Sequence, residues 1–203
     1  MMMRKQKGLL IVFSGPSGSG KGTVLAEVMK QYPDMEFSVS ATTRAPRDGE
    51  IDGVNYFFKS KEEFQDMVAN GGFIEWAQFC ENCYGTPRAY VESRLDQGKD
   101  VVLEIEVQGA MQVKAAFPDA VLIFNLPPSM EELKNRLVGR NTETSDVVAK
   151  RLATAKEELA IADRYDYVIV NDVVETAATK FLSILAGERC RSERNTWLLN
   201  EFK

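Results

Sequence analysis

The chain has 203 residues, a formal net charge of −5 and no histidine. At roughly 150 residues per domain this length predicts one domain with excursions, and such a chain can bury about 70% of its unfolded surface without disulfide or metal cross-links. The acidic balance disfavours non-specific nucleic-acid binding, and the absence of imidazole excludes Ser-His and Cys-His hydrolases.

The amino-terminal segment has basic residues followed by an apolar run, as a signal peptide does. The run Leu9–Phe13 is shorter than the roughly 7–15 residues of such a signal, and no stretch approaches the ~18 apolar residues of a membrane span. Cys80, Cys83 and Cys190 form an odd, sparse set, which indicates reduced thiols. We therefore expect a soluble, cytoplasmic protein. The C-x-x-C spacing of the first two cysteines leaves a zinc or redox site as an alternative, although zinc would need further ligands.

Short apolar, β-branched runs predict buried strands, and these runs alternate with helical patterns. The predicted strands are Leu9–Phe13, Phe37–Ser40, Val101–Ile105, Ala120–Phe124 and Tyr167–Val170. The predicted helices are Lys21–Gln31, Pro87–Gln97, Met130–Arg140, Val147–Ala162 and Val174–Ala186. Two capping boxes, Ser60-x-x-Glu63 and Ser129-x-x-Glu132, begin helices, and Pro87 suits a first helical position. This alternation predicts an α/β fold with a parallel sheet covered by helices on both faces.

Two excursions interrupt this rhythm. Between Ala41 and Gly85 the short strands Asn55–Phe58 and Phe73–Phe79, one helix and several glycines predict a small α+β insertion. Around Arg136–Arg151, two polar helices joined by a turn at Asn141–Thr144 predict a second one.

The segment from Gly15 to Thr23, GPSGSGKGT, directly follows the first predicted strand and opens the first predicted helix. Its glycines allow backbone N–H groups to converge on phosphate oxygens, and Lys21 adds a positive charge between the β- and γ-phosphates. In the strict pattern a Ser or Thr follows the lysine, whereas here Gly22 comes before Thr23. The alternative is a glycine-rich turn that only caps a helix. The pattern indicates a nucleoside triphosphate site but not which reaction takes place there.

Glu104 and Glu106 lie in VVLEIEVQG, at the end of a predicted strand. Two positions apart on a strand, they are expected to share one face at its carboxyl end, where ligands of open α/β sheets bind. One carboxylate could hold Mg²⁺ through water and leave the other for a second ligand. A solvated strand end is the alternative.

Arginines form the third group of candidates: Arg44 and Arg47 flank a turn, Arg136 and Arg140 share a helix face, and Arg151 follows. Taken alone such residues fit a solvated surface, but beside a phosphate loop guanidinium groups suit phosphate oxygens. A phosphate monoester, with a second pKa of about 6, is largely dianionic at neutral pH and needs no general base as an acceptor. The missing histidine is consistent with such an acceptor.

These motifs resemble those of bacterial-type guanylate kinases, the ATP:GMP phosphotransferases. The resemblance covers about residues 8–186 and is carried by GLLIVFSGPSGSGKGT, SVSATTRAPRDGE, FIEWAQF, YGT, LEIEVQG, RLVGRNTET and VIVND, of which SATTRAPRDGE is the most specific. It implies a P-loop NTPase-type core (residues 8–39, 87–128 and 160–186), a small α+β GMP-binding lobe (40–86) and a helical lid (129–159). The C-terminal tail, residues 187–203, lies outside the resemblance.

The resemblance also implies an activity and its residues: transfer of the γ-phosphoryl group of ATP to GMP, with Mg²⁺, in GMP recycling. The implied ATP-binding residues are Gly15, Pro16, Ser17, Gly18, Ser19, Gly20, Lys21, Gly22 and Thr23. The implied GMP-binding residues are Ser40, Arg44, Arg47, Tyr56, Glu75, Tyr84, Thr86 and Glu106. Thr23 and Glu104 are implied on the metal side, directly or through water. The implied catalytic residues are Lys21, Arg44, Arg136, Arg140 and Arg151.

Other interpretations of the same residues remain. A guanylate-kinase-like binding module of scaffold proteins would not need the phosphate loop, which is intact here. An adenylate- or uridylate-type kinase shares the loop but gives no reason for Glu75 or SATTRAPRDGE. Glu75 could also face solvent, and Tyr56 and Tyr84 could be core aromatics. The chain departs from the family at Asn82 and Cys83, where relatives often carry a histidine and an aromatic residue, and at Glu104 and Glu106, which are aspartates in some relatives.

Overall fold

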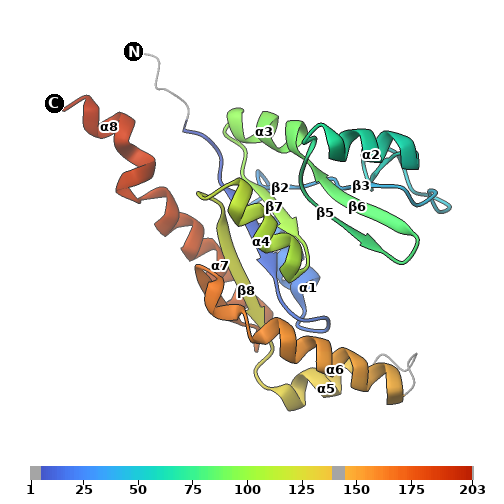
Figure 1. Ribbon diagram of the computed structural model, residues 1–203. Coiled ribbons are helices and arrows are strands. Elements are labelled where there is room, and N and C mark those ends of the chain that lie inside the picture. Colours follow the sequence, from blue (N-terminus) through green and yellow to red (C-terminus); the bar gives the residue numbers. More distant parts are fainter. Residues whose placement is uncertain (1–5, 139–144, 203) are drawn as a thin grey trace. The chain divides into compact units, whose positions relative to one another are not determined.

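The computed structural model describes residues 6–138 and 145–202 (Figure 1). The chain divides into two compact units, Met1–Val12 with Asp34–Ala120 and Phe13–Pro33 with Val121–Lys203. Strand β1 (Leu10–Ser14) is fully buried and contributes residues to both units. The predicted turn Asn141–Thr144 and Arg140 lie outside the described residues.

The first unit contains one edge of the larger sheet. Strand β2 (Glu36–Phe37) pairs in parallel with β7 (Val101–Glu104), and β7 is in turn the neighbour of β1. Helix α3 (Arg88–Asp96) precedes β7 and helix α4 (Val107–Ala116) follows it. The residues of β7 other than Glu104 are buried, as its apolar sequence predicts.

The excursion between Ala41 and Gly85 forms a second, four-stranded sheet in the order β4-β3-β6-β5. Its strands are β3 (Ala41–Thr42), β4 (Phe57–Phe58), β5 (Phe73–Phe79) and β6 (Asn82–Pro87), and its helix is α2 (Lys61–Ala69). Phe64 of α2 and Phe73 of β5 stack with ring centroids 4.4 Å apart in its core. The predicted capping box of α2 is present: Ser60 Oγ accepts from Glu63 N, and a Glu63 carboxylate oxygen accepts from Ser60 N.

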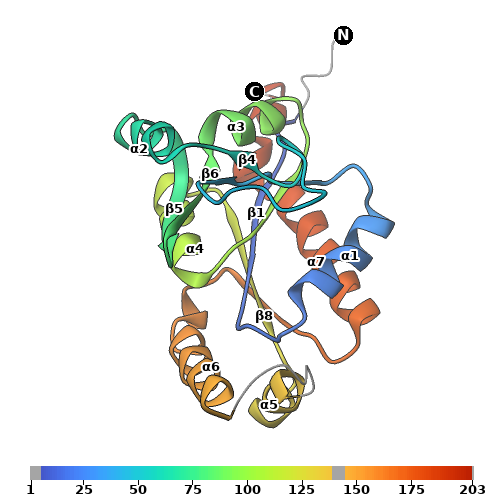
Figure 2. The same ribbon diagram turned by 90° about the vertical axis from the view of Figure 1, so that its right-hand side faces the viewer.

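The second unit contains the other edge of the larger sheet. Strand β8 (Val121–Leu126) pairs in parallel with β9 (Tyr167–Val170) and is also a neighbour of β1. Helices α1 (Lys21–Gln31) and α7 (Val174–Arg189) run side by side (Figure 2), and Phe181 of α7 meets Phe13 edge to face at 5.3 Å. Helices α5 (Met130–Val138) and α6 (Ser145–Leu159) pack through a small apolar cluster of Leu133, Leu137 and Ala155. The remaining elements are η1 (Ala162–Arg164), η2 (Ser192–Asn195) and α8 (Thr196–Asn200).

The predicted α/β class is confirmed, since the larger sheet has the order β2-β7-β1-β8-β9 and its strands alternate with helices along the chain. Several details of the prediction were wrong. Of the predicted strand Phe37–Ser40 only Phe37 lies in a strand, at the end of β2. Strand β6 was not predicted, and α7 continues past Ala186 to Arg189. Pro87 ends β6 and is the N-cap of α3, so it precedes the first helical position.

The largest error concerns the segment after β7. Helix α4 was not predicted, and Glu106 was expected on a strand with Glu104. The strand ends at Glu104, and Glu106 is the N-cap of α4. The chain turns there because Val107, Ala110 and Val113, at helical spacing, are all buried.

No helix in residues 6–138 and 145–202 is long and apolar enough to cross a membrane.

Candidate functional site

The phosphate loop connects β1 to α1 in a conformation that requires glycine. Gly15, Gly18 and Gly20 have φ values of 145°, 89° and 85°, which L side chains rarely adopt. At Gly15 an added Cβ would also collide with the carbonyl oxygen of Asn125. Glycine is therefore needed both for conformation and for space.

Lys21 is the first residue of α1, and its ammonium group bends back over the loop. Its Nζ donates to the carbonyl oxygen of Gly15 at 2.6 Å and to that of Pro16 at 3.4 Å. A positive charge is thus held beside the N–H groups of the loop and of the helix N-terminus, an arrangement that favours phosphate.

The carbonyl oxygen of Ser19 anchors the loop from within. It accepts a hydrogen bond from Nδ2 of Asn125 at 2.9 Å and another from Nδ2 of Asn171 at 2.8 Å. Both asparagines are buried, and Oδ1 of each is a buried acceptor without a partner among the residues that the structure describes. Neither was predicted as a site residue, although an asparagine inside the apolar strand β8 and another directly after β9 were visible signals.

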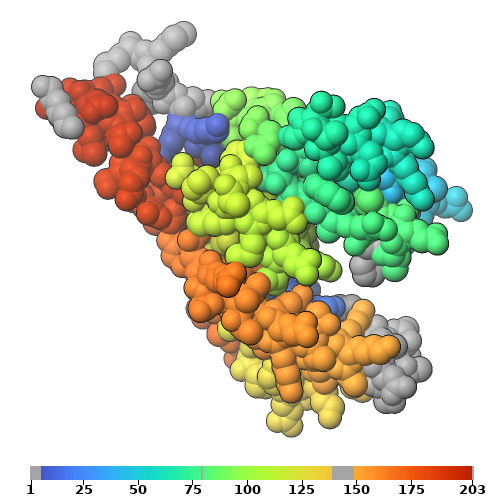
Figure 3. Space-filling model, in the orientation of Figure 1, coloured from blue at the N-terminus to red at the C-terminus, as the bar shows by residue number. Residues whose placement is uncertain are grey.

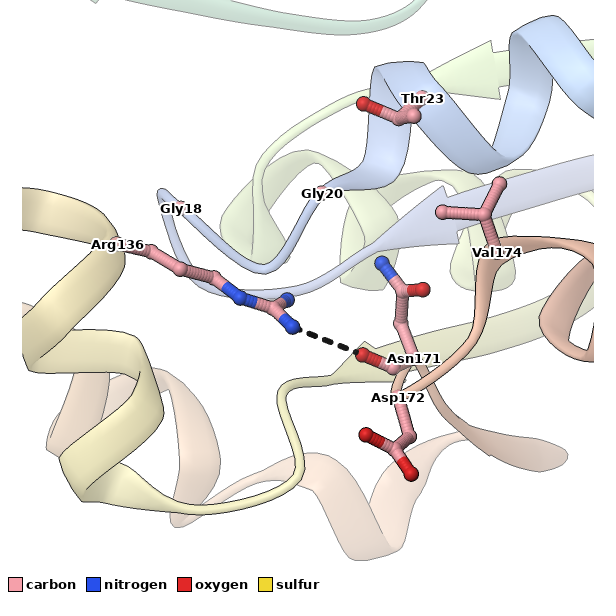
Figure 4. A pocket seen from close by; sticks show the side chains of 7 residues that line it. All are labelled: Gly18, Gly20, Thr23, Arg136, Asn171, Asp172 and Val174. Carbon is pink, nitrogen blue, oxygen red and sulfur yellow. Dashed lines mark hydrogen bonds between the residues drawn. The ribbon is translucent and has the colours of Figure 1, made fainter. Parts of the chain in front are cut away.

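A cavity of about 280 Å³ opens beside the loop (Figure 4). Its lining comes from the loop, α1, α5, the segment after β9 and the start of α7, and consists of Gly18, Gly20, Thr23, Arg136, Asn171, Asp172 and Val174. Thr23 is exposed and presents its hydroxyl on the α1 side, while the carboxylate of Asp172 points away from it. Partly exposed glycine backbone, a hydroxyl group and a guanidinium group are suitable partners for the phosphates of a nucleotide.

Arg136 is the predicted lid arginine that the structure brings to this cavity. Its Nε donates to Oε1 of Glu132 at 2.8 Å, one helical turn earlier, and its Nη2 donates to the carbonyl oxygen of Asn171 at 3.3 Å. Glu132 therefore orients the guanidinium group toward the loop. Arg151 is half-buried on α6.

The residues expected to hold the GMP phosphate gather in the first unit. The guanidinium carbon of Arg44 lies 5.4 Å from the ring centre of Tyr56, and the rings of Tyr56 and Tyr84 are 6.1 Å apart. Glu50, which was not predicted, accepts from Nη2 of Arg44 at 2.8 Å and from the backbone N of Arg47 at 2.7 Å. The hydrogen bond from Arg44 is the main reason why the pKa of Glu50 is lowered. Glu50 thus orients Arg44, while the Arg47 side chain lies in an exposed position.

Glu75 on β5 carries a buried carboxylate, only 7% exposed. Its Oε1 accepts a hydrogen bond from Oγ1 of Thr86, on the neighbouring strand β6, at 2.6 Å. Burial raises the pKa of Glu75, and the hydrogen bonds from Thr86 oppose that shift. The alternative of a solvent-facing Glu75 is therefore wrong. An acceptor held in this way is suited to pair with a ligand that donates hydrogen bonds.

The raised pKa of Glu75 predicts how replacement by glutamine changes stability with pH. Above its folded-state pKa the buried carboxylate is charged and its desolvation costs stability, whereas below the unfolded value of about 4.5 it is protonated in both states. We expect Glu75→Gln to be more stable than the wild type at pH 7, and this difference to shrink as the pH falls toward 4. Urea unfolding at both pH values measures it. A variant destabilised at pH 7 would contradict the assigned cause.

Three predicted residues remain to be placed in the first unit. Ser40 is half-buried just before β3, and its carbonyl oxygen accepts from Phe57 N at 2.9 Å. Glu104 and Glu106 are both exposed, one at the end of β7 and the other at the start of α4. Their side chains are available to a ligand at the carboxyl end of β7.

Two of the predicted residues carry exposed oxygen atoms of the kind that magnesium prefers. Among the described residues there is no group of three or more His, Cys, Asp or Glu side chains that could hold a metal ion. Mg²⁺ in nucleotide enzymes is commonly held by one or two protein oxygens, substrate phosphates and water. The exposed hydroxyl of Thr23, in the second unit, is one oxygen donor of this kind, and the exposed carboxylate of Glu104, in the first unit, is another.

Comparison with known proteins shows which family this chain is similar to. The family model described as guanylate kinase matches residues 7–188. A guanylate kinase of Bacillus anthracis is 58% identical over 193 residues, which cover 95% of this chain and 94% of that protein. One of Desulfitobacterium hafniense is 53% identical, covering 97% and 98%. The crystal structure of guanylate kinase from Anaplasma phagocytophilum is 37% identical, with a TM-score of 0.72, covering 95% of this chain and 92% of the other.

Proposed function

Because the chain belongs to the guanylate kinase family and transfers a phosphoryl group from ATP to GMP, we propose that its candidate residues divide into a GMP set and an ATP set. Ser40, Arg44, Arg47, Tyr56, Glu75, Tyr84, Thr86 and Glu106 form the GMP set. The phosphate loop, residues 15–23, with Arg136, Arg140 and Arg151 forms the ATP set. The residues of the GMP set would bind the acceptor, and those of the ATP set would bind the donor and the transferring phosphoryl group.

The buried Glu75 carboxylate is the observation that best supports this assignment for the acceptor base. Guanine presents N1–H and the N2 amine as adjacent donors, whereas adenine presents an acceptor at N1. An ionised carboxylate accepts hydrogen bonds and donates none, so it pairs with guanine and repels adenine. The 2.6 Å hydrogen bond from Thr86 holds Oε1 in place. Ser40 and Glu106 would complete the recognition of the base.

The phosphate of GMP would be held by Arg44, Arg47, Tyr56 and Tyr84. Glu50 supports this by fixing one edge of the Arg44 guanidinium group through a 2.8 Å hydrogen bond. A dianionic phosphate needs positioning and charge neutralisation, and arginine supplies both. An oxygen of this phosphate then bonds to the γ-phosphorus of ATP, the bond between that phosphorus and the β–γ bridging oxygen breaks, and ADP leaves with the negative charge.

The ATP phosphates would lie on the glycine loop, with Lys21 beside the transferring group. Lid arginines would neutralise charge that spreads over the γ-phosphoryl oxygens in the transition state. The orientation of Arg136 toward the loop supports that role for one of them. Mg²⁺, when bound, neutralises phosphate charge, and Thr23 and Glu104 are the residues that would hold it, directly or through water.

The organisation proposed is a core of residues 8–39, 87–128 and 160–186, a GMP-binding lobe of residues 40–86 and a lid of residues 129–159, followed by the tail 187–203. Such lids complete a site and exclude water when they close. Because the substrates are small nucleotides, we propose that the protein acts in the cytoplasm and has no membrane or nucleic-acid partner.

Replacing Glu75 with glutamine tests the recognition of guanine. Glutamine keeps the shape but removes the charge and turns one acceptor into a donor, so one charge-assisted hydrogen bond, worth roughly 1.5–3 kcal/mol, is lost. We expect kcat/KM for GMP to fall about 10- to 100-fold and the ratio of GMP to AMP use to fall with it. Coupled assays of ADP release with each acceptor measure both.

The matched control is Glu81→Gln, because Glu81 is exposed in the turn between β5 and β6 and belongs to neither set. It should leave both acceptors unaffected. An unchanged GMP/AMP ratio in Glu75→Gln would place base recognition elsewhere.

A further inference from the structure

Helix α4 approaches the Glu75 carboxylate closely at one residue, Gly109. A Cβ at this position would lie 2.9 Å from Oε2 of Glu75 and 3.3 Å from Cδ1 of Ile105. The first of these distances is shorter than real Cβ contacts, so an alanine here would displace the carboxylate. The backbone of Gly109 is helical and does not itself require glycine, and helices favour alanine over glycine. Space for Glu75 is therefore the physical reason for glycine at this position.

The next turn of α4 contacts the backbone beside Glu75. Trp76 N donates to Oε1 of Gln112 at 3.2 Å, and Nε2 of Gln112 donates to the carbonyl oxygen of Trp76 at 3.3 Å. One side-chain amide thus binds both polar backbone groups of a single strand residue. This contact fixes β5 against α4 from a residue next to Glu75.

Strand β5 is irregular at this point. Its antiparallel pairing with β6 shifts register between Phe73 and Trp76, so Glu75 lies within the irregularity. Irregular pairing re-aims side chains and leaves their direction less determined by the ladder. In the space-filling view the yellow-green atoms of α4 lie against the green atoms of the smaller sheet (Figure 3). Contacts from α4 therefore help to fix the direction of the Glu75 side chain, which the β5–β6 ladder alone leaves less determined.

We propose that Gly109 and Gln112 are positioning residues that set where the Glu75 carboxylate lies and thereby the selectivity for guanine. Gly109 leaves the space that Oε2 occupies, Gln112 fixes the backbone that carries the side chain, and Thr86 holds Oε1. The inference rests on the proposed role of Glu75 in reading the base. Neither positioning residue needs to touch GMP for this effect.

The test is Gly109→Ala, with Gly187→Ala as the matched control. Gly187 is also a helical glycine, but nothing lies within 4 Å of a Cβ added there. Because one misdirected hydrogen bond costs about tenfold, we expect Gly109→Ala to raise the KM for GMP about tenfold and to lower the GMP/AMP ratio, with kcat and the KM for ATP within about twofold. Gly187→Ala should change none of these.

A second variant, Gln112→Met, keeps the length of the side chain and removes both hydrogen bonds to Trp76. It should shift the KM for GMP in the same direction, and it carries the test if Gly109→Ala does not fold. In a Glu75→Gln background the effect of Gly109→Ala should shrink, because residues that act through the same group are not additive.

The outcomes separate this inference from the proposed function. If Glu75→Gln impairs GMP use and neither α4 variant does, Gly109 and Gln112 have no positioning role while Glu75 keeps its own. If Glu75→Gln has no effect either, both assignments are wrong. If Gly109→Ala lowered kcat by the same factor in the wild-type and in the Glu75→Gln background, the variant would have a general structural defect. That result would overturn the inference.

Discussion

Replacing Lys21 with methionine is expected to lower kcat for phosphoryl transfer by about a thousandfold while the protein stays folded. Removing one well-placed donor to developing negative charge commonly costs about 10²–10³ in kcat, and here a full positive charge is lost with it. The Nζ of Lys21 donates to the backbone carbonyls of Gly15 and Pro16, which are neutral groups, so the loss of these two hydrogen bonds is expected to cost little stability.

The fold of the loop does not depend on this ammonium group alone. The glycines and the hydrogen bonds from Asn125 and Asn171 to Ser19 maintain its conformation. Lys30→Met is the control, because Lys30 lies on the same helix, is 73% exposed and forms a surface ion pair with Glu27 of the kind that contributes little. Turnover of Lys21→Met near that of the control, with both variants showing wild-type circular dichroism, would refute the role of Lys21.

The phosphate loop could be predicted because its determinants are local. Positive φ values at Gly15, Gly18 and Gly20 are a property of glycine itself, and the strand and helix on either side have strong periodic patterns. The same holds for the capping box of α2, where two residues three apart supply both hydrogen bonds. In these segments the sequence pattern and the structure agree.

Helix α4 escaped prediction because two local signals compete at its start. The apolar run of β7 continues through Ile105, so it extends the strand pattern, and Gly109 in the first turn weakens the helical one. Packing favours the helix over the strand, because Val107, Ala110 and Val113 share one buried face only at helical spacing. As a result, Glu106 was predicted to lie on a strand, whereas it is the N-cap of α4. It does lie near the end of β7, as predicted.

The contacts that orient the site join residues that are far apart in the sequence, and they produce no periodic pattern in it. Asn125 and Asn171 are 106 and 152 residues from Ser19 along the chain, and each was visible only as a polar residue in or after a strand. Gln112 is 36 residues from Trp76. Residue types could suggest such partners, but only the folded chain shows which backbone group each one binds.

Alanine at Arg136 is expected to lower kcat by about 10²–10³-fold and to change the KM for GMP by less than about threefold. The guanidinium group extends from α5 toward the loop, held by Glu132 at 2.8 Å and by the carbonyl oxygen of Asn171 at 3.3 Å. We therefore expect it to meet charge on the transferring group, as proposed for the ATP set. An interaction that strengthens only in the transition state affects kcat more than ground-state binding.

Two further variants separate geometry from charge. Arg136→Lys keeps the charge but loses the planar fork that binds two phosphate oxygens, so it should recover only part of the rate. Lys134→Met removes a positive charge from an exposed position of the same helix and should leave kcat unchanged. Arg151→Ala, on α6, should resemble Arg136→Ala. Steady-state kinetics with ATP and GMP varied in turn distinguish the possibilities: a tenfold rise in the KM for GMP with kcat unchanged would make these arginines ground-state binders, and the lid would then have no part in the chemical step.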